Sequence, residues 1–156
     1  MQQQSRGTIL VLCEGNHCRS PIAEGLLRSA LGPGIQVESA GLAAEPGYAA
    51  HAIAVDLMAA REIDITAFRS RQVTPAMAIA AGLILVMDRR QKAWCESLAP
   101  STRGRVYLLG SWLPPERQEI PDPMGKDREV FDQAFGLILE SVDTWLPHLN
   151  SFRNTL

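Results

Sequence analysis

The stretch TILVLCEGNHCRSPIAEGLLRSAL, residues 8–31, carries the pattern that decides the predicted fold. Its apolar run at residues 9–12 predicts a buried strand that ends at Cys13. A polar turn follows, and Pro21 then occupies the position that proline favours at the start of a helix, with Ser20 before it as the N-cap. The pattern predicts a strand, a tight loop and a helix, with a cysteine where the strand ends and an arginine where the helix begins.

Length and composition indicate an ordinary soluble domain. The 156 residues suit a single hydrophobic core, so we expect one domain over residues 1–156. Hydrophobic residues make up 46% and charged residues 21%, which is typical of globular proteins. The net charge of −2 does not favour a nucleic-acid or membrane surface, and we expect the chain to bind neither.

The three cysteines, Cys13, Cys18 and Cys95, indicate a reducing compartment. Their number is odd, and the residues before the first strand lack the pattern of a secretory segment. We therefore expect a cytoplasmic protein, in which cysteines are more often catalytic or redox-active than bridged. No cysteine and histidine spacing matches a zinc site, so we expect neither a metal nor another cofactor.

The rest of the chain alternates short apolar runs with helical patterns. Further strands are predicted at residues 35–40, 83–87 and 106–109, and helices at residues 48–60, from Thr74 onward, at 89–98 and at 129–146. Residues 110–128 carry four prolines and predict a long loop, which is often functional in a compact domain. This order predicts a doubly wound, flavodoxin-like parallel sheet of about four strands, with helices on both faces and ligands at the carboxyl ends of the strands.

The loop between Cys13 and Arg19 has the composition of an anion-binding site. Gly15 and Asn16 tolerate positive φ, so the backbone can curl and turn successive N–H groups inward. The positive end of the following helix adds to this field, which also favours a thiolate at Cys13. Arg19 offers a planar fork for two oxygens of a tetrahedral oxyanion, and Ser20 can donate a hydrogen bond to the sulfur. We therefore predict a phosphate site formed by Glu14, Gly15, Asn16, His17, Cys18 and Ser20.

A thiolate inside a phosphate cradle points to in-line attack on phosphorus. Arg19 and the backbone N–H groups would hold the equatorial oxygens, and water would later hydrolyse the phosphocysteine. The leaving group needs an acid that can afterwards act as base toward water. The best candidate is Asp122, which two flanking prolines hold in the long loop.

These residues resemble the signature of the low-molecular-weight protein tyrosine phosphatases. The resemblance rests on the spacing from Cys13 to Arg19, on Ser39-Ala40-Gly41, on Ser70-Arg71-Gln72 and on Asp122-Pro123. It implies that Cys13 is the nucleophile, that Arg19 clamps the transition state and that Asp122 is the general acid.

The resemblance also implies roles around this centre. Ser39 would support the loop together with Asn16 and Ser20. Cys18 resembles the family's second cysteine, which can form a reversible disulfide with the nucleophile, although it could equally be a small apolar residue packed behind the loop. The implied substrates are phosphotyrosine proteins, and the implied partner is a bacterial tyrosine kinase. We expect a monomer or a weak dimer.

Three departures from the family's pattern bear on the substrate. Met124 stands where a tyrosine usually follows Asp-Pro, which weakens the aromatic wall of the pocket. Phe68 stands where a histidine usually precedes Arg-Ser, so a polar partner of the network around Asn16 is expected to be missing. The segment 42–48 holds Tyr48 but no tryptophan. Tyr48 and Met124 are therefore expected at the pocket rim.

The residues leave three other functions open. Arsenate reductases of this fold use two further cysteines after the third strand, where this chain has only Cys95. A phosphocysteine carrier would need neither Arg19 nor Asp122. A phosphate-binding module without turnover would not need Cys13.

Overall fold

A computed structural model describes residues 7–154 of the chain. Over these residues four parallel strands form one sheet in the order β2-β1-β3-β4. The strands are β1 (Thr8–Cys13), β2 (Gln36–Gly41), β3 (Leu83–Val86) and β4 (Val106–Leu108). The prediction of a doubly wound parallel sheet is confirmed, and all four strands lie close to their predicted positions.

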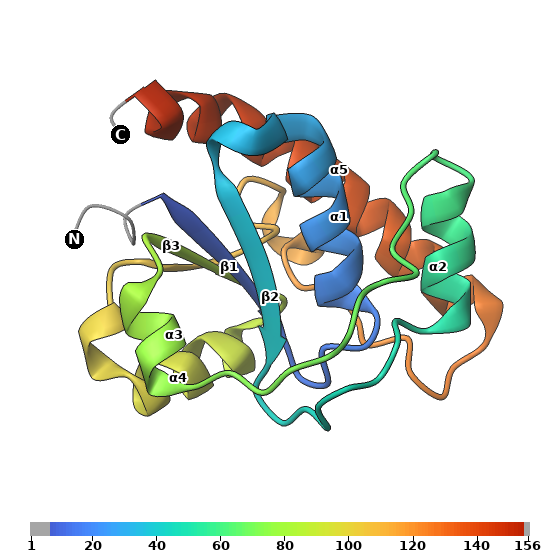
Figure 1. Cartoon of the computed structure of the whole chain (residues 1–156), viewed down its shortest axis with the longest axis horizontal. Helices are drawn as coiled ribbons and strands as arrows, with labels where there is room; N and C mark the ends of the chain where they lie inside the picture. The colour runs from blue at the N-terminus through green and yellow to red at the C-terminus, as the bar shows by residue number, and fades with distance from the viewer. Residues whose placement is uncertain (1–6, 155–156) are drawn as a thin grey trace.

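Helices cover both faces of this sheet (Figure 1). One face packs against α1 (Arg19–Leu31) and α5 (Arg128–Asn154), and the other against α3 (Pro75–Ala80) and α4 (Arg89–Leu98). Helix α2 (Ala52–Ala59) packs against α1 (Figure 1). Short 3-10 helices occur at Gly32–Gly34, Pro100–Thr102 and Pro115–Arg117.

The inner strand β1 contributes side chains to the hydrophobic clusters on both faces of the sheet, which explains its continuous apolar sequence. Ile9, Val11 and Cys13 belong to the cluster beneath α1 and α5, whereas Leu10 and Leu12 belong to the cluster beneath α3 and α4. Successive side chains of a strand point to opposite faces, so a strand covered on both sides needs apolar residues at every position. This burial fixes the position of Cys13 at the carboxyl end of β1.

The helix predicted over residues 48–60 begins later, at Ala52. The backbone N–H of Tyr48 donates to Ser70 Oγ at 3.0 Å, and the carbonyl of Tyr48 accepts from the Ser70 N–H at 2.7 Å. These bonds hold the backbone at Tyr48 in a non-helical path. His51 is the N-cap of α2, and its Nδ1 accepts from the Ile53 N–H at 3.1 Å.

The final helix was predicted to end at residue 146, before Pro147, and this prediction is wrong. Helix α5 continues through Pro147 to Asn154. A proline inside a helix costs about 3 kcal/mol. Trp145 and Leu149, on either side of Pro147, are almost fully buried, and Trp145 Nε1 donates to the Leu109 carbonyl at 2.7 Å. Burying two such side chains contributes about 2–3 kcal/mol each, which outweighs the cost of the proline.

The carboxyl ends of the strands leave no room for a side chain at Gly41. Gly41 pairs with Cys13 across β1 and β2. A Cβ atom built at Gly41 would lie 2.8 Å from the Glu14 carbonyl oxygen and 3.0 Å from Cβ of Asn16. The loop after β1 therefore approaches β2 so closely that only glycine fits.

We expect Gly41→Ala to lower the free energy of unfolding by about 1–3 kcal/mol, because the added methyl group would overlap the Glu14 carbonyl. Urea unfolding of the purified chain measures this change. Gly136→Ala is the matched control, because nothing lies within 4 Å of a Cβ at that position in α5 and alanine favours a helix. An unchanged midpoint for Gly41→Ala would show that the loop can move away from β2.

Candidate active site

The loop of residues 13–19, here called the phosphate loop, joins β1 to α1 and curls around the sulfur of Cys13. Asn16 has a φ of 53°, in the left-handed region, and its N–H donates to Cys13 Sγ at 3.2 Å. Ser20 Oγ lies 3.0 Å from the same sulfur. Two polar groups, one in the loop and one in the first turn of α1, are thus directed at Cys13 Sγ.

The prediction that Ser20 caps α1 is wrong, because the helix begins at Arg19, two residues before the predicted start at Pro21. Cys18 occupies the N-cap position without a side-chain capping bond. The Ser20 hydroxyl instead contacts Cys13 Sγ and accepts from Asn16 Nδ2 at 2.8 Å. The Ser20 hydroxyl therefore binds residues of the phosphate loop and not the backbone of α1.

Asn16 connects the phosphate loop to two other segments. Its Nδ2 donates to Ser39 Oγ at 3.1 Å as well as to Ser20 Oγ, and its Oδ1 accepts from the Arg71 N–H at 2.9 Å. Asn16 is fully buried, and both of its amide N–H groups and its oxygen have partners. The expected gap left by Phe68 is absent, because the Arg71 backbone supplies the donor while Phe68 packs against the hydrophobic core.

Arg19 lies between the phosphate loop and the long loop that precedes α5. It is 3% exposed, its Nη1 donates to the Ile120 carbonyl at 2.9 Å, and its Nη2 lies 3.7 Å from Asp122 Oδ2. The Asp122 side chain is 45% exposed, and its Oδ1 accepts from the Met124 N–H at 3.1 Å. The structure thus brings the three residues predicted to carry the chemistry to the same edge of the sheet.

Tyr48 and Met124, the two residues predicted at the rim, are both exposed, but only Tyr48 lines the hollow beside the phosphate loop. That hollow is formed by Gly15, His17, Ala43, Glu45, Tyr48 and Ser70. Met124 lies in the same loop as Asp122.

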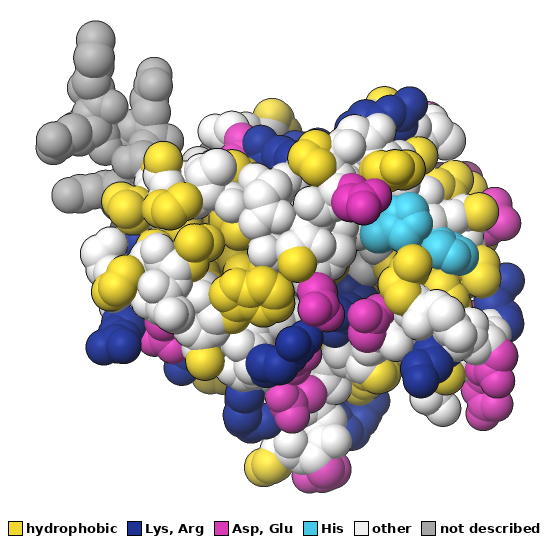
Figure 2. Space-filling model, turned by 90° about the horizontal axis from the view of Figure 1, so that it is seen from below, with side chains coloured by type: hydrophobic (Ala, Val, Ile, Leu, Met, Phe, Trp, Pro, Cys, Tyr) yellow, Lys and Arg dark blue, Asp and Glu magenta, His cyan; other side chains and the backbone are white. Residues whose placement is uncertain are grey.

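Seen from below the view of Figure 1, the molecule carries acidic and basic side chains side by side, with histidines next to hydrophobic side chains (Figure 2).

The three cysteines are all free and buried. Burial raises the pKa of the Cys18 thiol to about 12, with smaller contributions in the same direction from Cys13 and Asp122. Burial also raises the pKa of Cys95, which lies in α4 and packs into the cluster beneath α3 and α4. Cys95 is thus a helix residue of the core, as the sequence indicated.

Sequence reasoning missed the surroundings of His51. The His51 N–H donates to the His17 carbonyl at 2.9 Å, and the rings of His17 and His51 lie edge to face, 5.5 Å apart. The His51 ring also packs against Phe131, 4.7 Å away. Burial, and next the proximity of His17, lower the pKa of His51. The local sequence does not predict these contacts of His51, because histidine is not a common N-cap residue.

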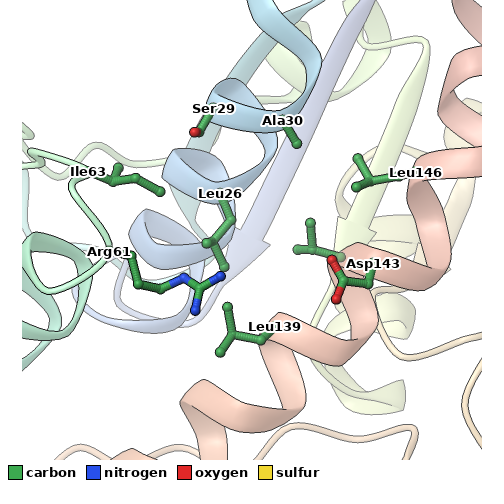
Figure 3. Close-up of a pocket in the computed structure, with 9 residues that line it drawn as sticks. Leu26, Ser29, Ala30, Arg61, Ile63, Leu139, Asp143 and Leu146 are labelled. Carbon is green, nitrogen blue, oxygen red and sulfur yellow. The ribbon is translucent and has the colours of Figure 1, made fainter.

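A second hollow lies between α1 and α5, away from the phosphate loop. Leu26, Leu139 and Leu146 line it, with Arg61 and Asp143 on opposite sides (Figure 3). None of the predicted site residues belongs to it. Among residues 7–154 no group of three or more histidine, cysteine, aspartate or glutamate side chains could hold a metal ion, and no helix there is long and apolar enough to span a membrane.

Comparison with known proteins places this geometry in a family. The family model described as low molecular weight phosphotyrosine protein phosphatase matches residues 8–154. A relative from Ralstonia nicotianae, named probable low molecular weight protein-tyrosine-phosphatase EpsP, is 44% identical over 144 residues, which cover 92% of this chain and 97% of the relative.

Solved structures of similar proteins share the fold. Vibrio vulnificus Wzb in complex with benzylphosphonate has a TM-score of 0.83 at 36% identity, over 90% of this chain and 97% of that one. The YwlE arginine phosphatase from Geobacillus stearothermophilus has a TM-score of 0.84 at 28% identity, over 92% and 93% of the two chains. The matched region contains the phosphate loop, Asn16 with its network and the Asp122 loop, and the chain belongs to the low molecular weight protein tyrosine phosphatases, a family of enzymes.

Proposed function

We propose that this chain hydrolyses phosphotyrosine in proteins, and simple aryl phosphates, through a phosphocysteine intermediate. The observation that carries the proposal is the position of Arg19, which is buried between the phosphate loop around Cys13 and the carboxylate of Asp122. A nucleophile, a clamp for phosphate oxygens and an acid thereby surround one space. Family membership supports this choice of substrate, as does the benzylphosphonate bound by the similar Wzb protein.

In the first step, the Cys13 thiolate attacks phosphorus in line with the leaving oxygen. The sulfur–phosphorus bond forms while the ester phosphorus–oxygen bond breaks, and Asp122 gives its proton to the departing tyrosine oxygen. Arg19 binds two equatorial oxygens of the phosphoryl group with its fork. Because the Ile120 carbonyl already holds Nη1 of Arg19, the guanidinium is oriented before the substrate arrives.

In the second step, water replaces the sulfur. Asp122, now ionised, takes a proton from water, the new phosphorus–oxygen bond forms, and the sulfur leaves as a thiolate. The Asn16 N–H and the Ser20 hydroxyl, 3.2 Å and 3.0 Å from Cys13 Sγ, can both donate to that thiolate as it departs. Inorganic phosphate is released and the enzyme returns to its starting state.

Two competing functions are less well supported. An arsenate reductase would pass its disulfide to cysteines after β3, and Cys95 in that region is fully buried in the core. Phosphoarginine is the other candidate substrate, because the YwlE fold is similar, but the 28% identity to YwlE is lower than the 44% identity to EpsP. Turnover of phosphotyrosine, phosphoserine and phosphoarginine peptides would rank these substrates, and we expect phosphotyrosine to rank first.

The cytoplasmic location, the single domain over residues 1–156, the monomeric or weakly dimeric state and the tyrosine kinase partner stay predictions. A chain that needs a free thiolate at Cys13 works best in a reducing compartment, which supports the location. A kinase that makes phosphotyrosine would supply the substrate proposed for this site.

We expect Cys13→Ser to reduce hydrolysis of para-nitrophenyl phosphate by about 10⁴-fold or more, because a serine hydroxyl cannot replace the thiolate. Binding of inorganic phosphate, measured by calorimetry, should survive, since Arg19 and the loop N–H groups remain. Cys95→Ala is the control and should retain activity. Full activity of Cys13→Ser would exclude the covalent mechanism.

We expect Asp122→Ala to affect poor leaving groups far more than activated ones, since only the former need a proton as they depart. General acids contribute about 10²–10⁴-fold, so phenyl phosphate should lose about that factor while para-nitrophenyl phosphate loses much less. Steady-state rates on the two esters give the comparison, with Glu116→Gln in the same long loop as control. Equal losses on both esters would remove Asp122 from the role of acid.

The raised pKa of Cys18 predicts selective alkylation. With a pKa of about 12, only about one Cys18 thiol in 10⁵ is ionised at pH 7. Iodoacetamide at pH 7 should therefore modify Cys13 in step with the loss of activity and leave Cys18 unmodified, as peptide mass spectrometry can show. In urea both cysteines should react. Rapid modification of Cys18 in the folded chain would contradict its buried, protonated state.

A further inference from the structure

Helix α4 begins with two arginines that its own local preferences do not explain. Arg89 and Arg90 directly follow the N-cap Asp88, and the first turn contains no acidic residue. The amino-terminal end of a helix carries partial positive charge, which disfavours cations there. A pair of arginines in this position indicates that partners outside the helix hold them.

Arg90 binds the phosphate loop. Its Nη2 lies 3.1 Å from Oε2 of Glu14, which is 76 positions away in the sequence. On its own helix the guanidinium lies 5.8 Å from the centre of the Trp94 ring, one turn further on. Arg90 is therefore held between an aromatic ring and the carboxylate of Glu14.

Glu14 places a negative charge in a loop that must accept an anion. It directly follows Cys13, and its carbonyl accepts from the Ala43 N–H at 2.8 Å, which fixes its backbone at the end of β2. A phosphate ester brings two further negative charges to the same loop. Without a counterion, Glu14 would repel the substrate that the N–H groups and Arg19 attract.

Arg89 offers an internal comparison. Its Nη1 lies 3.4 Å from Oε1 of Glu119, and its backbone N–H donates to Oε2 of the same residue at 2.8 Å. The side chains of Arg89 and Arg90 are similarly exposed, at 57% and 64%. The two arginines thus make the same kind of ion pair from the same helical turn, but only the partner of Arg90 lies in the phosphate loop.

We propose that Arg90 is a positioning residue of the phosphate site, which pairs with Glu14 and offsets its charge so that the loop binds a phosphate dianion with full affinity. The proposal rests on the proposed function in taking this loop as the phosphate site. It assigns no contact between Arg90 and the substrate, because Arg90 acts through Glu14.

The test is the affinity of the full chain for inorganic phosphate, measured by calorimetry. We expect Arg90→Gln to weaken binding by about three- to tenfold at low ionic strength, as suits one exposed charge pair. Glu14→Gln should bind phosphate at least as tightly as the unchanged chain, and the double variant should recover its affinity. Arg90→Lys should retain most of the affinity, and Arg89→Gln should leave it unchanged.

A purely structural role for Arg90 would give a different pattern. The loss in Arg90→Gln should shrink as salt is raised toward 1 M, because salt screens exposed charges. A loss that persists in high salt, a double variant as weak as Arg90→Gln, or an equal loss in Arg89→Gln would overturn the proposal. Thermal unfolding of each variant checks that the fold is intact.

The same measurement separates this inference from the proposed function. Phosphate binding is read without turnover, so an unchanged chain that binds phosphate but does not hydrolyse aryl phosphates contradicts the function alone. An unchanged chain that does not bind phosphate overturns the role of Arg90 as well.

Discussion

The hydrogen bond from Arg19 to the Ile120 carbonyl joins two loops whose residues are 101 positions apart. Arg19 is almost fully buried, and a buried guanidinium is strongly unfavourable unless its donors are paired. A charge-assisted bond of this kind contributes about 1.5–3 kcal/mol. Because Asp122 follows Ile120 by two residues, the same bond sets the distance from Arg19 to that carboxylate. The residues proposed as phosphate clamp and as acid are therefore positioned together.

The buried polar groups at the strand ends make this arrangement stiff. The amide of Asn16 donates to Ser20 and to Ser39 of β2, and its oxygen accepts from the backbone N–H of Arg71. A buried network is stabilising only when its members are satisfied, so each segment restricts the others. The close approach at Gly41 completes the restriction, because the loop cannot shift toward β2. A rigid cradle of this kind suits charge stabilisation, which needs donors already in place.

Apart from the start of α1, elements with strong local signals formed as predicted, whereas boundaries decided by distant contacts did not. Helix α4 spans the predicted residues 89–98, and the side chain of Asp88 caps its first turn by accepting from the Gln91 N–H. The predicted start of α2 was wrong, because the hydrogen bonds between Tyr48 and Ser70 override local helix propensity. The predicted end of α5 was wrong, because the burial of Trp145 and Leu149 outweighs the cost of Pro147. Such contacts join segments that are too far apart in the sequence for a local pattern to predict them.

The sequence by itself determined the strand, the curled loop and the helix around Cys13, because spacing within one continuous segment fixes which groups face the same space. That spacing also indicated the family and led to the proposal that Cys13 is the nucleophile. Only the tertiary structure decided the distance from Arg19 to Asp122, the Arg71 N–H that completes the bonds of Asn16 beside Phe68, and the pairing of Glu14 with Arg90. The physical reason is that these contacts join groups 103, 55 and 76 positions apart, and the packing of the sheet and its helices chooses which distant groups meet.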